Sequence, residues 1–138
     1  MGNSKILVVD DERDMRIFVS TVVETLGFEA DAAKDGGEAL LKAGSNPPVL
    51  VILDVMMPKI EDGIQTYRQF RSDPKLAPIP IIILSAIAKK TFLHSIKVLN
   101  PRQGSQLPEP EAYMEKPPDA SELSRIIGKL LPSVPQTK

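Results

Sequence analysis

Short apolar runs alternate with segments of helical periodicity along most of the chain. Runs of branched apolar residues that end abruptly in polar ones are typical of strands buried on both faces of a sheet. Such runs predict five strands, at residues 6–9, 28–32, 49–53, 79–84 and 111–114. Apolar residues at spacings of three and four predict five helices, at residues 14–26, 37–43, 62–71 (starting at Asp62 or Gly63), 89–99 and 121–131. This alternation predicts an α/β fold, an open, parallel, doubly wound sheet with helices on both faces.

Proline-rich segments limit where the strands can start and where a loop is expected. Pro80 is tolerated in the fourth strand only near its beginning, because proline cannot donate a ladder hydrogen bond. Residues 100–110 contain three prolines, one glycine and two glutamines, which predicts an irregular loop. We therefore expect one domain at residues 4–131, followed by a disordered tail or the start of a linker at residues 132–138.

Composition narrows the possible chemistry. A chain of 138 residues, 42% hydrophobic and 25% charged, fits one soluble globular domain. The absence of cysteine excludes disulfides, thiolate metal sites and a cysteine nucleophile, and a single histidine, His94, excludes a multi-histidine zinc site. We expect His94 to be a surface residue rather than a phosphate donor. Any chemistry must then use carboxylates, hydroxyls and lysines.

Charge and hydropathy bear on location and partners. The formal net charge is -1, so no overall field recruits nucleic acid or anionic membrane. The longest apolar runs are far shorter than the roughly 20 residues that span a membrane, and the polar start does not resemble a signal peptide. We expect a cytoplasmic protein with no membrane insertion. No basic recognition helix follows Leu131, so direct binding to nucleic acid is not expected.

Polar side chains stand at the carboxyl ends of the predicted strands. They are Asp10, Asp11, Asp54, Ser85 and Lys116. In doubly wound sheets ligands bind beyond these ends, so the five side chains should meet on one rim. Three carboxylates in close proximity repel one another unless a cation is shared among them, and Mg²⁺ (or Mn²⁺) suits such oxygen ligands. Asp54 could then act as a nucleophile that accepts phosphate, with Ser85 donating to one phosphoryl oxygen and Lys116 neutralising another.

Four motifs occur in a fixed order: Ile6–Glu12, Val51–Pro58 followed by Asp62-Gly63, Ile83–Ala86, and Tyr113–Pro117. Together they resemble the receiver domain of bacterial two-component response regulators over almost the whole chain. The resemblance implies a flavodoxin-like receiver fold with strand order 2-1-3-4-5. It also implies a signalling switch rather than an enzyme, catalysing only its own Mg²⁺-dependent phosphorylation and dephosphorylation.

The resemblance implies a role for each matching position. Asp54 would be the phosphoacceptor, supplied by a sensor histidine kinase or a histidine phosphotransfer protein, and a downstream protein would read the result. Asp10, Asp11, Asp54 and the Met56 carbonyl would hold Mg²⁺. Ser85 would be the switch hydroxyl and Tyr113 the switch aromatic. Lys116 would contact the phosphoryl group and precede a cis bond to Pro117, and the small Ala86 would leave the site accessible.

The chain also departs from the family pattern. Ser85 and Lys116 are 31 positions apart (116 minus 85), and the surplus lies in the proline-rich stretch around residues 100–111. Residues 107–111 replace the small turn that usually precedes the fifth strand, which puts the conventional signalling face in doubt. We expect the stretch to govern partner choice, with an inert insertion as the alternative.

Plainer interpretations remain for most of these residues. Asp10 and Asp11 could be helix N-caps, Ser85 a strand-end hydroxyl, Tyr113 a core aromatic and Lys116 a solvated loop lysine. Glu12 is expected to serve only the first helical turn, and the methionines at 15, 56, 57 and 114 to pack in the core. Two other functions compete: a phosphorylation-independent, receiver-like interaction module, and a phosphohydrolase with an aspartate nucleophile. The second commonly needs another aspartate two residues later, where Met56 stands.

Overall fold

The computed structural model describes residues 4–99 and 107–131, and it alternates strands and helices as the sequence predicts. The strands are β1 (Lys5–Val9), β2 (Glu29–Ala33), β3 (Leu50–Leu53), β4 (Ile81–Ser85) and β5 (Ala112–Glu115). The helices are α1 (Arg13–Thr25), α2 (Gly36–Ser45), α3 (Ile60–Ser72), α4 (Lys89–Leu99) and α5 (Ala120–Leu130). None of the helices within these residues has the length and apolar character needed to cross a bilayer.

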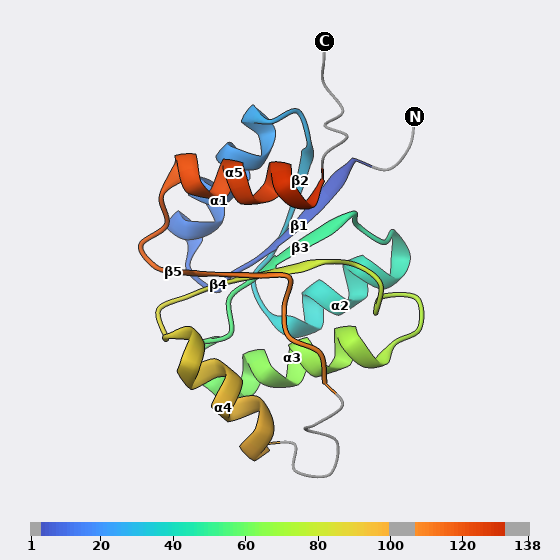
Figure 1. Ribbon diagram of the computed structural model, residues 1–138. Coiled ribbons are helices and arrows are strands. Elements are labelled where there is room, and N and C mark those ends of the chain that lie inside the picture. Colours follow the sequence, from blue (N-terminus) through green and yellow to red (C-terminus); the bar gives the residue numbers. More distant parts are fainter. Residues whose placement is uncertain (1–3, 100–106, 132–138) are drawn as a thin grey trace.

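The five strands form one parallel sheet in the order β2-β1-β3-β4-β5, which confirms the doubly wound fold. Helices α1 and α5 cover one face, and α2, α3 and α4 cover the other (Figure 1). Because all strands run in the same direction, their carboxyl ends lie along one edge of the sheet, at the left in Figure 1. That edge is where the polar residues of the sequence motifs converge.

Two apolar cores explain why residues 6–9 of β1 are all apolar. Ile6 and Val8 pack in the core beneath α1 and α5, whereas Leu7 and Val9 point into the core beneath the other three helices. All four side chains are at most 1% exposed. Fully burying an aliphatic side chain of this size contributes about 1.5–3 kcal/mol relative to leaving it in water. The central strands are therefore fixed rigidly, and so are the residues that follow them.

Several element boundaries differ from the sequence prediction. Helix α3 begins at Ile60 because the Asp62 carboxylate accepts a hydrogen bond from the backbone N–H of Lys59 at 3.2 Å, which places Asp62 inside the first turn. Strand β4 begins at Ile81, since Pro80 can only accept, and its carbonyl takes the N–H of Val51 at 3.0 Å. The predicted tail, and the predicted loop up to residue 106, lie outside the described residues.

A single arginine fastens the segment leading into β5 to helix α3. The Arg71 side chain is 3% exposed, and all five of its N–H groups have an acceptor. The acceptors are the Tyr67 hydroxyl (3.2 Å), the carbonyls of Ala77 (3.4 Å), Ile79 (3.3 Å) and Glu109 (3.2 Å), and the Glu111 carboxylate (2.9 Å). We call Arg71 with these five acceptors the Arg71 clamp.

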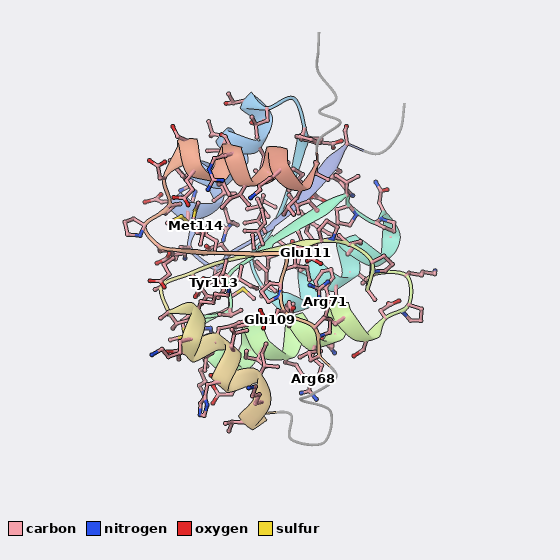
Figure 2. The ribbon with its side chains drawn as sticks, in the orientation of Figure 1. Arg68, Arg71, Glu109, Glu111, Tyr113 and Met114 are labelled. Atoms are coloured by element: carbon pink, nitrogen blue, oxygen red, sulfur yellow. The ribbon has the colours of Figure 1, made fainter. Side chains whose placement is uncertain are left out.

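Two further hydrogen bonds extend the Arg71 clamp. The Tyr67 hydroxyl donates to the Pro108 carbonyl at 2.5 Å, and the Glu111 carboxylate also accepts the N–H of Ile81 at 2.8 Å. Figure 2 shows Arg71 beside Glu109 and Glu111, below the start of β5. The chain is therefore fixed at the amino end of β4 before β5 begins, on the sheet edge opposite the polar rim.

Candidate functional site

An acidic pocket lies at the carboxyl edge of the sheet. Asp10 and Asp54 directly follow β1 and β3, which pair in register up to Val9 and Leu53. Oxygen atoms from the carboxylates of Asp10, Asp11 and Asp54 all lie within 4.8 Å of one another. Asp10 and Asp54 are each 2% exposed, whereas Asp11 is exposed. The pocket holds about 230 Å³ and is lined by Asp11, Glu12, Asp54, Met56, Pro58, Ala86 and Lys116.

Backbone amides hold the two buried carboxylates. The N–H of Glu12 donates to Asp10 Oδ1 at 2.9 Å, and the N–H of Met56 donates to Asp54 Oδ1 at 3.0 Å. The N-cap of α1 is Glu12, so the interpretation of Asp10 and Asp11 as helix caps is wrong. Their side chains are committed to the pocket instead.

Lys116 joins the acidic side chains. Its Nζ lies 2.9 Å from Asp10 Oδ2, 3.2 Å from Asp54 Oδ2 and 3.1 Å from Glu12 Oε1. The Lys116–Pro117 peptide bond is cis, as the resemblance implies, and the Lys116 N–H donates to the Ser85 carbonyl at 2.9 Å. Burial alone would lower the pKa of Lys116, but the hydrogen bond to Asp10 and the charges of Asp54 and Asp10 raise it above its usual value. The ammonium is therefore charged, and the solvated-loop interpretation is wrong.

The pocket remains short of positive charge. Burial raises the pKa of Asp10 and of Asp54, and the backbone hydrogen bonds and Lys116 offset this only in part. Within the pocket, the carboxylates of Asp10, Asp11, Glu12 and Asp54 face one lysine. A cation that shared these oxygens would relieve their mutual repulsion.

The donor set fits a hard divalent cation. Mg²⁺ prefers oxygen ligands and commonly uses one or two carboxylates together with a carbonyl and water. Asp10, Asp11 and Asp54 offer carboxylate oxygens, and Met56 is 39% exposed at the pocket wall rather than packed in the core. Met57 and Met114, by contrast, are buried as expected. The four residues that the sequence analysis assigned to Mg²⁺ are thus brought together.

Ser85 and Tyr113 connect the pocket to the turn between β4 and α4. Ser85 is fully buried, and its hydrogen bond to Asp54 is one of the smaller influences that lower the pKa of Asp54. The Tyr113 hydroxyl donates to the carbonyl of Ile87, two residues beyond Ser85, at 2.7 Å. The Tyr113 ring is half-buried, 5.6 Å from the ring of Phe92 on α4, and burial raises the pKa of its hydroxyl. Tyr113 is therefore held at the rim by its hydroxyl as well as by packing.

Gly63 explains the Asp62-Gly63 motif. A Cβ atom at this position would lie 2.0 Å from the Cα of Val55 and 2.1 Å from its carbonyl oxygen. Only glycine lets α3 approach the backbone between Asp54 and Met56 so closely. The loop that carries the central carboxylate is thereby pressed into place by α3.

Sequence reasoning missed two residues of the site. Glu12 occupies the N-cap position of α1 without a side-chain capping hydrogen bond, and its carboxylate contacts Lys116 although the side chain is 62% exposed. Arg16, one turn into α1, donates from Nη1 to the Asp10 carbonyl at 2.8 Å. The signal for Arg16 is weak, because a backbone carbonyl acceptor leaves no trace in the sequence. His94 is exposed on α4, as expected.

Comparison with known proteins assigns the chain to a family. The sequence model of the response regulator receiver domain matches residues 6–100. The chain belongs to the response regulator receiver domain family. The receiver motifs of the sequence and the order of its five strands agree with this assignment.

Relatives of this receiver domain are signalling regulators. The alkaline phosphatase synthesis transcriptional regulatory protein PhoP of Bacillus subtilis is 36% identical over 129 residues, which cover 94% of this chain and 49% of PhoP. Among solved structures, the chemotaxis protein CheY4 of Vibrio cholerae has a TM-score of 0.75 at 25% identity, covering 94% of this chain and 99% of that one. The receiver domain of the Francisella response regulator 1452 has a TM-score of 0.71 at 30% identity, covering 93% and 96%. The receiver thus spans about half the length of PhoP.

Proposed function

We propose that this receiver accepts a phosphoryl group on Asp54 in a Mg²⁺-dependent reaction and then changes the surface it presents to a partner protein. The observation that carries the proposal is the position of Asp54. Its carboxylate lies at the wall of an open pocket, 3.2 Å from the Lys116 ammonium and within 4.8 Å of oxygens from the acidic pair Asp10 and Asp11. A buried carboxylate placed this way is costly for the fold, so a chemical role is favoured over a structural one.

The chemical step would join Asp54 to phosphorus. A carboxylate oxygen of Asp54 forms the new P–O bond, while the bond from phosphorus to the imidazole nitrogen of a phosphohistidine breaks. The imidazole keeps that electron pair, so the product is an acyl phosphate on Asp54. The donor would be a sensor histidine kinase or a histidine phosphotransfer protein. The reaction needs no oxidant or reductant.

The residues around Asp54 would prepare it for this step. Met56 N–H fixes the carboxylate from one oxygen, and the Lys116 ammonium, 3.2 Å from the other, is placed to neutralise an incoming phosphoryl oxygen. The buried Ser85 hydroxyl could donate to a second phosphoryl oxygen. A bound Mg²⁺ or Mn²⁺, held by Asp10, Asp11, Asp54 and Met56, would supply further neutralisation of the transferring group.

The same contacts suggest how the surface could change. Ser85 and the Ile87 carbonyl belong to one short turn, and Tyr113 is bound to that carbonyl. If Ser85 follows the phosphoryl group, the turn must move and the acceptor of the Tyr113 hydroxyl moves with it. A downstream protein that contacts α4 and β5 would then meet a different surface.

Labelling with a small-molecule donor tests the proposal. Incubation with acetyl phosphate and Mg²⁺ should add the mass of one phosphoryl group, and Asp54→Asn should abolish the addition because the nucleophilic oxygen is lost. Excess chelator should also abolish it. Equal labelling of the Asp54→Asn variant would refute the assignment of the acceptor. A wild-type protein that stays unlabelled with both Mg²⁺ and Mn²⁺ but binds its targets would instead be a phosphorylation-independent interaction module.

A further inference from the structure

Every polar group of Asp10, in the backbone and in the side chain, has a partner. Its N–H donates to the Ala33 carbonyl at 3.1 Å, and its carboxylate oxygens contact the N–H of Glu12 and the Lys116 ammonium. Its carbonyl accepts from Arg16 Nη1 at 2.8 Å. The first three contacts come from the sheet and from the acidic pocket itself. The fourth comes from a side chain that does not line the pocket.

Asp11 depends on that fourth contact more than its neighbours do. Asp10 and Asp54 are buried and held by backbone amides, whereas Asp11 is exposed and its carboxylate accepts no hydrogen bond from the residues that the structure describes. The Asp10 carbonyl and the Asp11 N–H belong to one rigid peptide plane. Fixing the carbonyl therefore fixes the plane from which Asp11 projects.

We infer that Arg16 is a positioning residue, which holds the Asp10–Asp11 peptide so that Asp11 is aimed at the cation site. The inference rests on the proposed function, because it assumes that the acidic pocket binds Mg²⁺. Arg16 acts through the backbone and does not touch the cation or the phosphoryl group. It completes the fixation of the one carboxylate that the pocket leaves without support.

Charge and geometry give opposite expectations for removing Arg16, which makes the inference testable. If the guanidinium acted only as a nearby positive charge, it would repel Mg²⁺, and its loss would tighten Mg²⁺ binding several-fold. If it positions Asp11, its loss should weaken binding. Mutating residues that orient metal ligands typically changes metal affinity about 10- to 100-fold. Because the ligand that Arg16 positions, Asp11, is exposed, we expect an effect near the lower end, at about 10-fold.

The experiment compares Mg²⁺ titrations of the whole chain, followed by backbone amide NMR shifts of the pocket residues. Arg16→Met removes the charge and the hydrogen bond, and Arg16→Lys keeps the charge and a donor of different shape. Arg13→Met is the matched control, since it removes an exposed positive charge from the first turn of the same helix. We expect weaker binding in Arg16→Met, partial recovery in Arg16→Lys, and unchanged or tighter binding in Arg13→Met.

A second measurement separates positioning from loss of fold. Labelling of Arg16→Met by acetyl phosphate should be slow at low Mg²⁺ and should recover when Mg²⁺ is raised, because the acceptor and Lys116 are intact. Unchanged or tighter Mg²⁺ binding by Arg16→Met, with wild-type binding present, would overturn the role of Arg16 and leave the proposed function standing. A defect that extra Mg²⁺ does not correct would also overturn it. No Mg²⁺ binding by the wild type would refute both.

Discussion

Replacement of Arg71 by methionine isolates the contribution of the Arg71 clamp to stability. Methionine keeps most of the apolar stem and packs against Tyr67, whose ring lies 5.1 Å from the Arg71 guanidinium carbon. It removes all five donors at once. The backbone carbonyls of Ala77, Ile79 and Glu109 then lose this partner, while the Tyr67 hydroxyl keeps its bond to Pro108. The perturbation is therefore confined to the junction between α3, the start of β4 and the segment before β5.

The distances decide how much each contact contributes. The two bonds from Nη1, at 3.4 and 3.3 Å, are long and weak. The three remaining bonds, to Tyr67, Glu109 and Glu111, are 2.9–3.2 Å long. At about 1 kcal/mol for each of these three, the free energy of unfolding should fall by about 3 kcal/mol. The charge of Glu111 adds little, because its side chain is 38% exposed and water can replace the guanidinium.

Urea unfolding followed by far-ultraviolet circular dichroism measures this loss, since the chain has no tryptophan for fluorescence. With an m-value of about 2 kcal/mol per molar, the midpoint should drop by about 1.5 M. Arg125→Met is the control, because its pair with Glu122 spans 3.5 Å between side chains 60% and 54% exposed and should contribute less than about 1 kcal/mol. If Arg71→Met lowers stability no more than Arg125→Met does, the clamp does not stabilise the fold as argued.

Four further outcomes are expected. Burial raises the pKa of Asp54, so the contribution of Asp54 to stability should fall as the pH rises from its ordinary pKa of 3.8 through the higher pKa of the folded state. At pH 7 the free energy of unfolding of Asp54→Ala should therefore be about 1 kcal/mol higher than that of the wild type in urea titrations, and a less stable variant would contradict this. Gly63→Ala should lose about 2 kcal/mol in the same urea assay, because its Cβ would overlap the Val55 backbone; wild-type stability would disprove the overlap. Glu12→Gln should change stability by less than about 0.5 kcal/mol, given its exposure, and a larger change would mean that its contact with Lys116 is not solvent-screened. Replacing residues 101–106 with a short glycine turn, which spares Pro108 and Glu109, should leave labelling by acetyl phosphate unchanged and weaken binding to the kinase or target; equal binding to every partner would show the segment to be inert.

The central strands and the rim could be predicted because local patterns specify them. β1, β3 and β4 contain the continuous apolar runs 6–9, 50–53 and 81–84, and each run is followed by a polar residue that a parallel sheet brings to one edge. Asp10, Asp54, Ser85 and Lys116 are therefore found together, as expected from the sequence. The role of Tyr113 as a switch, by contrast, stays a prediction that the resemblance supplies.

Long-range contacts to the backbone could not be predicted. Arg71 reaches Glu109 and Glu111 across 38 and 40 positions, and three of its five acceptors are carbonyls, which every residue possesses. Arg16 likewise binds a carbonyl. The predicted start of α3 is too late for a related reason. The side chain of Lys59 is a poor helix cap, and the Asp62 carboxylate inside the helix accepts the hydrogen bond from the Lys59 backbone N–H.

The Arg71 clamp also has a consequence for how such a chain can evolve. It fixes the chain at Glu109 and Glu111, immediately before β5 starts at Ala112. The number of residues between α4 and this fixed point can then change without shifting the strand register that aligns Tyr113 with Ile83 and brings Lys116 to the pocket. Insertions and deletions upstream of the clamp can accumulate under selection for new partners while the arrangement of the acidic pocket is kept.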